Sequence, residues 1–471
     1  MRTAICTLFW LAVTSNADSK SSLEAEARLP IGGSRSGRFE MEPALKTTPN
    51  SLRIPELRRL GYTYKLEYAR PFHWTGSGRV SEHIFPLRSP SGDGLVRKQS
   101  RNTIAGGESQ QRTAISPIKS IRDEVFTTPL DIGGQLFDLI VDVGSSDTWV
   151  VVDGFRCLKS DGCQFGPTYK KTSSYSQTAG QYFDTKLTDG TKAIGLMATE
   201  KFGLGNISLS DQAIGFVNSS WWQGDMISSG ILGLGFPSHT NARNATIQAK
   251  DQKGAKLTYA PIFTKMYRSK MIDPVFSIAL NRIGEEPGVL ALGGLPDASI
   301  RHSEKFSRAP MQLLSLIPKA IKSEDGLTDY GFYVVNADSI TINSQSAQLP
   351  NGPVQLILDS GSRFSHLPKT VIDALVKAWK PKPAYGILGW LTQEYRVGCD
   401  DKPPQLGIVL NGTTVAFDGK DLIAKVAGGI CVIGVANSPN TQWVLGANFM
   451  RSVVTVFDVG AAEMRFASRI R

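Results

Sequence analysis

Two aspartates occupy nearly the same sequence context. Asp142 follows the apolar run 137–141, Asp359 follows the apolar run 354–358, and a glycine stands two residues after each. A glycine there permits a tight turn whose backbone N–H groups can point at the carboxylate. If the two turns meet, the carboxylates share one proton, because two negative charges a few ångströms apart do not form readily. Such a pair can act as general base on a water and as general acid on a carbonyl oxygen.

The surroundings of the two aspartates also repeat. The triplet Ile-Leu-Gly at 231–233 begins 89 residues after Asp142, and Val-Leu-Gly at 444–446 begins 85 residues after Asp359. An ordinary turn aspartate explains either position alone, but not both halves at matched spacing. We interpret the repeat as two lobes built on one plan, each of which supplies one carboxylate.

The elements that must position these aspartates are mostly strands. From about residue 123 onward the chain consists of short runs rich in Val, Ile and Phe, separated by Gly, Asn, Asp and Pro. Runs of this length and composition are typical of strands. Helical periodicity is limited, and residues 369–379 are the best helix candidate. The sequence therefore predicts a mainly β body.

The first 17 residues have the pattern of a secretory signal peptide. Arg2 precedes an apolar run at 4–13, and small residues at 15–17 mark a cleavage point. A buried N-terminal strand is the alternative. No stretch of the chain reaches the roughly 18 consecutive apolar residues of a membrane helix. We expect a protein without a stable membrane anchor that enters the secretory pathway and is secreted or vacuolar.

The positive charge is concentrated near the N-terminus. The chain carries a net charge of +10, and residues 18–120 hold 17 Lys or Arg against 10 Asp or Glu. Nucleic-acid binding would require basic residues clustered on a folded face with aromatic platforms, and the nearly neutral body shows none. We expect no nucleic-acid partner and predict a basic prosegment at 18–110, with a solvated linker as the alternative.

Four cysteines remain once Cys6 leaves with the signal peptide. An even number in an exported chain favours disulfides over metal ligation. The sequence leaves the connectivity open, and the local choice pairs Cys157 with Cys163 and Cys399 with Cys431.

Four asparagines begin Asn-x-Ser/Thr tripeptides, the acceptor sequence for N-glycosylation in a eukaryotic secretory pathway. Such tripeptides also arise by chance, so each one alone is weak evidence. The candidates are Asn206, Asn218, Asn244 and Asn411.

The sequence resembles the pepsin-like aspartic proteases. The stretch DVGSSDTWV at 142–150 resembles their first active-site signature, and DSGS at 359–362 resembles the second. Residues 230–237 resemble the apolar segment that supports the first aspartate loop, and 444–458 resemble the closing strands. The cysteine spacings match as well. The resemblance covers about residues 123–467.

This resemblance implies a bilobal pepsin-like fold. Two β-barrel-like lobes, 111–305 with Asp142 and 306–471 with Asp359, would be related by a pseudo-twofold axis with the cleft between them. The implied activity is an aspartic endopeptidase that hydrolyses internal bonds of polypeptide substrates at acid pH, using a water held between the two carboxylates. It implies no cofactor and no metal, a monomer, and a zymogen in which the prosegment acts as intramolecular inhibitor.

The resemblance also assigns supporting residues. Ser145 would donate a hydrogen bond to the first carboxylate, and Trp149 would lie beneath the hairpin, or flap, that closes over substrate. The residues that would support the two aspartate loops are Val143, Gly144, Ser145, Ser360, Gly361 and Ser362.

Two positions depart from the family pattern at the centre of the site. Val143 stands where the family has a threonine whose hydroxyl helps to join the two loops, whereas Ser360 keeps a hydroxyl on the other side. In the flap, an Asp-Gly turn at 189–190 is expected, and Leu187 or Thr188 stands where the family has a tyrosine. The flap residues are therefore Leu187, Thr188, Asp189 and Gly190.

Arg363 is a third departure, because the family prefers a small or apolar residue directly after the second signature. A cation near the cleft would favour acidic substrate side chains or lower the pKa of a neighbouring carboxyl group. An arginine that points into solvent is the alternative.

Val143 and the missing flap tyrosine support a second interpretation of the whole protein. A catalytically weak or inactive homologue would keep the cleft as a peptide- or protein-binding module. The presence of both Asp142 and Asp359 favours the enzyme.

Overall fold

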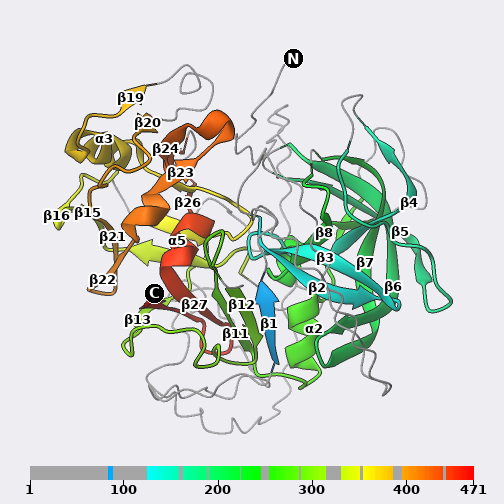
Figure 1. The fold of residues 1–471 in the computed structure, drawn as a ribbon. Coiled ribbons are helices and arrows are strands. Elements are labelled where there is room, and N and C mark those ends of the chain that lie inside the picture. Colours follow the sequence, from blue (N-terminus) through cyan, green and yellow to red (C-terminus); the bar gives the residue numbers. More distant parts are fainter. Residues whose placement is uncertain are drawn as a thin grey trace, which may run out of the picture. The chain divides into compact units, whose positions relative to one another are not determined.

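Strands dominate the part of the chain that the computed structural model describes, which confirms the predicted mainly β fold (Figure 1). The predicted signal peptide at 1–17, and the predicted prosegment except 83–87, lie outside the described residues. The structure describes residues 83–87 and 125–471, apart from 159–162, 188–189, 223, 245–253, 286–287, 315–329, 351–353, 386–394 and 439–441.

A nine-stranded sheet carries Asp142. Strand β6 pairs with both β2 and β7, so that β6, β2, β3, β8, β4 and β7 close into a barrel. Across the sheet the order is β10 (Lys256–Leu257), β9 (Ala242–Asn244), β5 (Ser176–Lys186), β6 (Lys192–Leu204), β2 (Thr127–Ile132), β3 (Gln135–Asp142), β8 (Ser228–Gly233), β4 (Trp149–Cys157) and β7 (Ile207–Trp221).

Three smaller sheets are formed by strands between residues 334 and 445, and the first of them carries Asp359 at the end of β17. The first has the order β14 (Val334–Ala337), β17 (Val354–Leu358), β26 (Trp443–Leu445), β18 (Ser365–Leu367) and β25 (Val435–Asn437). The second has β16 (Gln345–Ser346), β15 (Ser339–Ile342), β21 (Leu406–Leu410) and β22 (Thr413–Ala416). The third has β19 (Ala384–Tyr385), β20 (Tyr395–Val397), β24 (Cys431–Ile433) and β23 (Ile423–Lys425).

The strands next to the two aspartates repeat one pairing scheme. β3 runs parallel to β8 with Asp142 opposite Gly233, and β17 runs parallel to β26 with Leu358 opposite Leu445. β4 is antiparallel to β8 and parallel to β7, while β18 is antiparallel to β26 and parallel to β25. The repeat in the sequence is therefore a repeat of strand topology.

A six-stranded sheet contains strands from both sequence halves. Its order is β1, β12, β11, β27, β28 and β13, and the aromatic rings of Phe276 on β11 and Phe457 on β27 stack 4.5 Å apart. β1 falls within the predicted prosegment and pairs with β12 along its whole length. The bounds are β1 (His83–Leu87), β12 (Gly288–Leu292), β11 (Val275–Ala279), β27 (Val453–Asp458), β28 (Glu463–Ser468) and β13 (Ser307–Pro310).

Helices are short and few in the described ranges. The predicted helix at 369–379 is confirmed as α3 (Lys369–Ala378), which buries an apolar face of four residues against the body. The other α-helices are α2 (Ile262–Arg268) and α5 (Ala447–Ser452), and 3-10 turns occupy Pro237–His239, Gly419–Leu422 and Ala427–Gly429. None of the helices in the described residues is both long enough and apolar enough to cross a membrane.

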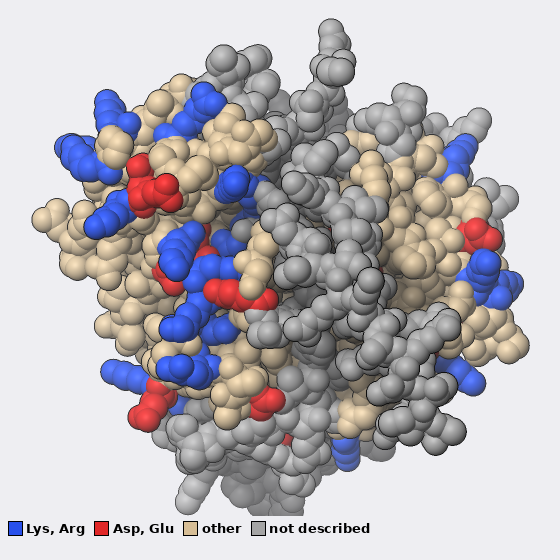
Figure 2. Space-filling model, in the orientation of Figure 1, with Lys and Arg blue, Asp and Glu red and all other residues tan. Residues whose placement is uncertain are grey.

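Charged residues of both signs mix on the face that Figure 2 shows. Arg282 pairs with Asp418 at 2.5 Å and with Asp421 at 3.0 Å, and Arg471 pairs with Glu285 at 3.2 Å. These basic groups are thus engaged by neighbouring carboxylates and do not form a purely positive patch.

Candidate active site

Asp142 is held at the end of β3 by its own turn. Its Oδ1 accepts a hydrogen bond from the Gly144 N–H (2.8 Å), and its Oδ2 accepts one from the Ser145 hydroxyl (2.6 Å). The Leu234 N–H, just beyond β8, donates to the Asp142 carbonyl oxygen (2.9 Å). The buried carboxylate therefore has two donors of its own loop, and the repeated Ile-Leu-Gly segment fixes the backbone behind it.

Asp359 follows β17 in the equivalent place. Its Oδ1 accepts from the Gly361 N–H (2.9 Å), and its own N–H donates to the Leu445 carbonyl oxygen (3.1 Å). The hydroxyl of Ser362 donates elsewhere, to the Phe364 carbonyl oxygen (3.0 Å). The two turns are alike in backbone but differ in their serine.

The two carboxylates meet across the loops. A Cβ added at Gly361 would lie 2.8 Å from Asp142 Oδ1, and a Cβ added at Gly144 would overlap Asp359 Oδ1. Each carboxylate thus lies against the glycine backbone of the opposite loop, where no side chain fits. The structure brings together the two aspartates that the sequence analysis singled out.

This proximity changes the acidity of the pair. Burial raises the pKa of Asp359 well above its usual value, and the negative charge of Asp142 and a hydrogen bond between the two side chains raise it further. The N–H groups of Gly361 and Ser362 act in the opposite direction but do not offset these causes. The pair therefore retains one proton in conditions where an isolated aspartate is ionised.

A hydroxyl joins the two loops from one side. Ser360 Oγ accepts a hydrogen bond from the Val143 N–H (3.0 Å) and donates one to the Val141 carbonyl oxygen (2.8 Å). The Val143 side chain is buried and has no hydroxyl with which to return these bonds. The one-sided connection matches what the sequence led us to expect.

The predicted flap is the hairpin formed by β5 and β6. Lys186 pairs with Lys192, and the Leu187 N–H donates to the Thr191 carbonyl oxygen (2.8 Å) to close the tip. Leu187 packs against an apolar cluster that contains Trp149. The tip of the hairpin therefore places an aliphatic side chain on this cluster, while Thr188 and Asp189 lie outside the described residues.

Two aromatic residues near the hairpin have other partners. The Trp149 ring meets that of Trp222 edge to face, with centroids 5.6 Å apart. Tyr182, upstream in β5, is buried, and its hydroxyl accepts a hydrogen bond from the Gly254 N–H (3.3 Å). Tyr182 is thus engaged away from the tip.

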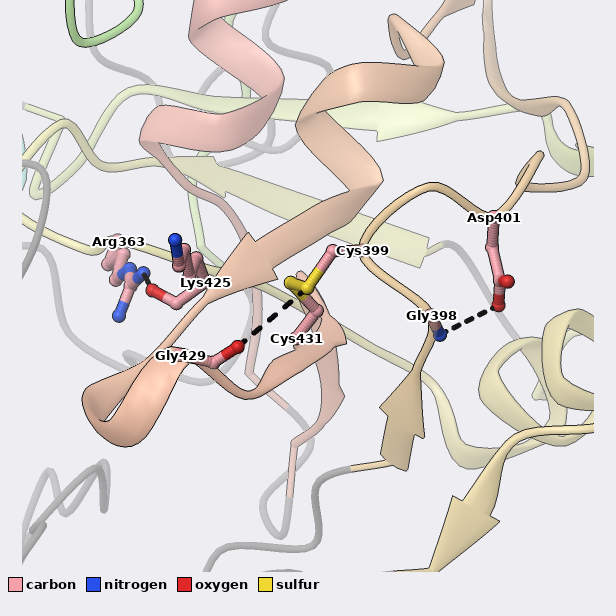
Figure 3. Close-up of a disulfide and its surroundings, with 7 residues drawn as sticks. All are labelled: Arg363, Gly398, Cys399, Asp401, Lys425, Gly429 and Cys431. Carbon is pink, nitrogen blue, oxygen red and sulfur yellow. Dashed lines mark hydrogen bonds between the residues drawn. A yellow bond between two sulfur atoms is a disulfide. The ribbon is translucent and has the colours of Figure 1, made fainter.

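Arg363 is partly buried and its guanidinium has partners within the protein. Its Nη2 donates to the Lys425 carbonyl oxygen (2.8 Å), and its guanidinium lies 4.8 Å from the centroid of the Phe364 ring. Figure 3 shows Arg363 beside Lys425, at the end of the strand that pairs with β24 and Cys431. The side chain is half-buried and links the second aspartate loop to β23.

Both disulfides of the local pairing are present. Cys157 bonds to Cys163 and Cys399 bonds to Cys431. Among the described residues, no group of three or more His, Cys, Asp or Glu could hold a metal ion. The four sequon asparagines, Asn206, Asn218, Asn244 and Asn411, are all exposed.

Asp147 lies inside the first signature, but its residue type and position in the sequence indicated no role for it. This carboxylate is almost fully buried and accepts hydrogen bonds from Asn241 and from the Tyr259 hydroxyl. The signal in the sequence was a charged residue within the signature, two positions before Trp149. Its partners could not be found in the sequence, because they lie 94 and 112 residues further along the chain.

Comparison with known proteins agrees with this geometry. The family model for eukaryotic aspartyl proteases matches residues 125–469. A protein of Aspergillus fumigatus named as a probable aspartic-type endopeptidase is 34% identical over 384 residues, which cover 76% of this chain and 82% of that protein. Secreted aspartic protease 3 of Candida albicans is 25% identical over 372 residues, with coverages of 74% and 81%.

A solved structure has the same fold. The crystal structure of an aspartic proteinase from Irpex lacteus superposes with a TM-score of 0.56 at 17% identity and covers 73% of this chain and 94% of that one. The family match, the relatives and the paired strand topology all agree. The chain belongs to the eukaryotic aspartyl protease family, the pepsin-like aspartic endopeptidases.

Proposed function

We propose that this protein hydrolyses internal peptide bonds at acid pH with a water activated between Asp142 and Asp359. The observation that carries the proposal is the meeting of the two carboxylates, each against the glycine of the opposite loop. The raised pKa of Asp359 supports it, because the reaction needs one proton on the pair.

The hydrogen bonds support different roles for the two aspartates. Asp142 has the Gly144 N–H and the Ser145 hydroxyl as donors, which stabilise its ionised form. Asp359 faces that charge and keeps the proton. We therefore take Asp142 as the general base and Asp359 as the acid.

In the first step Asp142 removes a proton from the water, and the oxygen of that water attacks the peptide carbonyl carbon. Asp359 gives its proton to the carbonyl oxygen, which yields a neutral gem-diol. Asp142 then passes the proton it gained to the amide nitrogen, and the C–N bond breaks. Asp359 regains a proton from a gem-diol hydroxyl as the new carboxyl group forms.

The same scheme sets the pH range. Activity is lost as pH rises through the raised pKa of Asp359, because the pair then carries no proton. It is lost again in strong acid, when both carboxyl groups are protonated and no base remains. The substrates are polypeptides, bound in the cleft between the proposed lobes 111–305 and 306–471.

We further propose that the protein is made as a secreted precursor. Residues 1–17 would be the signal peptide and 18–110 the inhibitory prosegment, with glycans on the exposed sequons. The pairing of β1 with β12 supports the docking of residues 83–87 on the body before processing. The name of the Candida albicans relative favours secretion over a vacuolar destination.

The test is proteolysis by the processed protein with each aspartate changed. We expect Asp142→Asn and Asp359→Asn each to lower kcat on a denatured protein at acid pH by about 10³-fold or more, since each removes an acid–base group. Asp373→Asn, an exposed aspartate on α3 paired with Lys369, is the matched control and should keep full activity. Turnover within tenfold of the parent in either site variant would contradict the mechanism. A parent that binds a statine peptide but turns over no substrate would favour the binding homologue.

A further inference from the structure

A two-stranded extension is attached to the outer edge of the hairpin β5–β6. β9 pairs antiparallel with β5, so that Phe183 lies opposite Ala242 and Tyr182 opposite Arg243, and β10 pairs with β9. The Tyr182 hydroxyl also accepts from the Gly254 N–H, just before β10. The extension therefore moves with the hairpin as part of one sheet.

Asn241, the residue before β9, contacts both the hairpin and the Asp142 loop. Its carbonyl oxygen accepts a hydrogen bond from the Asp184 N–H of β5 (3.4 Å). Its own N–H donates to Asp147 Oδ1 (2.9 Å), and its Nδ2 donates to Asp147 Oδ2 (2.7 Å). One residue thus bridges the hairpin strand and a carboxylate five positions after Asp142.

Asp147 is fixed on its own side as well. It is 2% exposed, and the Tyr259 hydroxyl is a third donor at 2.7 Å from Oδ1. A Cβ added at Gly233 on β8 would lie 2.6 Å from the Asp147 nitrogen, so the loop backbone has no room to shift toward β8. Movement at Asp147 is therefore transmitted to the loop that carries Asp142.

The electrostatics make this connection costly to break. Burial raises the pKa of Asp147, while the donors Asn241 and Tyr259 and the charge of Lys256 act in the opposite direction. A buried carboxylate that loses its donors is strongly destabilised. The three hydrogen bonds consequently hold Asp147, Asn241 and Tyr259 in one arrangement.

The two strands of the hairpin have different neighbours, because β6 pairs with β7 from Lys192 to Leu204 whereas β5 pairs on its outer side with β9. At the tip, the Leu187 N–H bonds to Thr191 and the Gly190 N–H to Leu187, and both bonds stay within the hairpin. Phe183 and Leu187 pack in the apolar cluster around Trp149, and apolar packing of this kind does not by itself fix the orientation of the hairpin. On the β5 side, Asn241 provides a directed link from the hairpin to the aspartate loop.

We propose that Asp147 is a positioning residue of the active site, which through Asn241 fixes the hairpin β5–β6 relative to the Asp142 loop. The expected effect on substrate binding rests on the proposed function, whereas the connection from Asp147 through Asn241 to β5 does not. Loosening the link lets the hairpin move more, so substrate is held less well while the carboxylate pair itself is unchanged.

Asn241→Ala tests the link because it removes the side-chain bond to Asp147 and leaves the carboxylate in place. In the full chain without substrate, we expect amide hydrogen exchange at Leu187 and Gly190 to rise roughly tenfold, the effect of one hydrogen bond to a charged group. In the processed enzyme, KM for a peptide substrate should rise about tenfold with kcat within about twofold. A purely structural defect would instead lower the active fraction found by statine-peptide titration.

Tyr259→Phe is the matched control, since it removes a donor to the same carboxylate without touching the residue that contacts β5. Exchange at the tip should then stay within about twofold of the parent. Equal acceleration in both variants, or none in Asn241→Ala, would overturn the proposal.

Asp147→Asn combined with Asn241→Ala should exchange no faster at the tip than Asp147→Asn alone, because both changes break the same contact. The exchange results stand even if the protein shows no proteolysis, so the two failures are distinguishable.

Discussion

The loops of Asp142 and Asp359 start from one strand pairing and end with different hydrogen-bond partners. In the first loop the serine three residues after the aspartate donates to the carboxylate, whereas in the second loop Ser362 donates to a backbone carbonyl oxygen. The repeated backbone places two identical groups face to face. In the proposed mechanism the differing side chains separate the roles of the two aspartates, because one carboxylate is stabilised as the anion and the other keeps the proton.

A second difference lies seven residues after each aspartate. Trp149 on β4 faces Ile231 of β8, and His366 on β18 faces Val444 of β26, so the two residues occupy the same place in the repeat. Trp149 packs in an aromatic cluster. His366 is buried, which lowers its pKa to about 4 although a hydrogen bond with the Asn437 backbone acts in the other direction. At this position the second half thus has a side chain that titrates, whereas the first half has a tryptophan, which does not.

The largest effect we predict from this comparison is on stability in acid. A histidine whose pKa is lowered on folding binds its proton more readily in the unfolded chain. The unfolding free energy therefore has its full value above pH 6.5 with respect to this group, and it decreases as pH falls toward 4. His366→Gln removes the titration. Between pH 7 and pH 4 the parent should lose about 3 kcal/mol more unfolding free energy than the variant, measured by urea unfolding.

His302→Gln, at a partly exposed position, is the control for this measurement and should follow the parent. The same pH dependence in the parent and in His366→Gln would show that the buried ring does not distinguish the two halves. If the variant does not fold, an NMR titration of the parent decides, since the His366 ring should stay neutral down to about pH 4.

The serine pair gives the next largest effect. Ser145→Ala removes a donor from the ionised pair, so the acid limb of the pH–kcat/KM profile should move to higher pH by about one unit. Ser362→Ala is the matched change in the second loop and should leave that limb in place, because its hydroxyl bonds to Phe364. Equal shifts in both variants would mean that the two loops support their carboxylates alike.

Much of the fold and the centre of the site could be predicted from local sequence. The strand before each aspartate, the glycine after it and the Ile-Leu-Gly or Val-Leu-Gly triplet lie in short windows, and each imposes its own backbone geometry. The helix at 369–379 was predictable for the same reason, from its apolar periodicity. The pairing of Asp142 with Asp359 followed from the repeat, because equal halves place equal residues on a common axis.

The asymmetry between the halves could not be predicted in this way. The serine spacing is the same in both loops, and only the tertiary structure shows that Ser362 bonds to Phe364. The link from Asp147 to Asn241 spans 94 residues and depends on the added strand β9, whose three residues leave almost no periodic signal. The position of the Arg363 side chain could not be decided from the sequence, because its acceptor, the Lys425 carbonyl oxygen, lies 62 residues away.

Val143→Thr tests the smallest difference between the loops, the hydroxyl that Ser360 has and residue 143 lacks. Ser360 accepts from one N–H and donates to one carbonyl oxygen of the first loop. By the symmetry of the strand pairing, a threonine hydroxyl at 143 would find the N–H of Ser360 and the carbonyl oxygen of Leu358. We then expect a gain of about 1 kcal/mol in unfolding free energy with unchanged kcat. A buried hydroxyl without partners costs a similar amount or more, so a loss in urea unfolding would show that the two loops have diverged in backbone as well as in side chains.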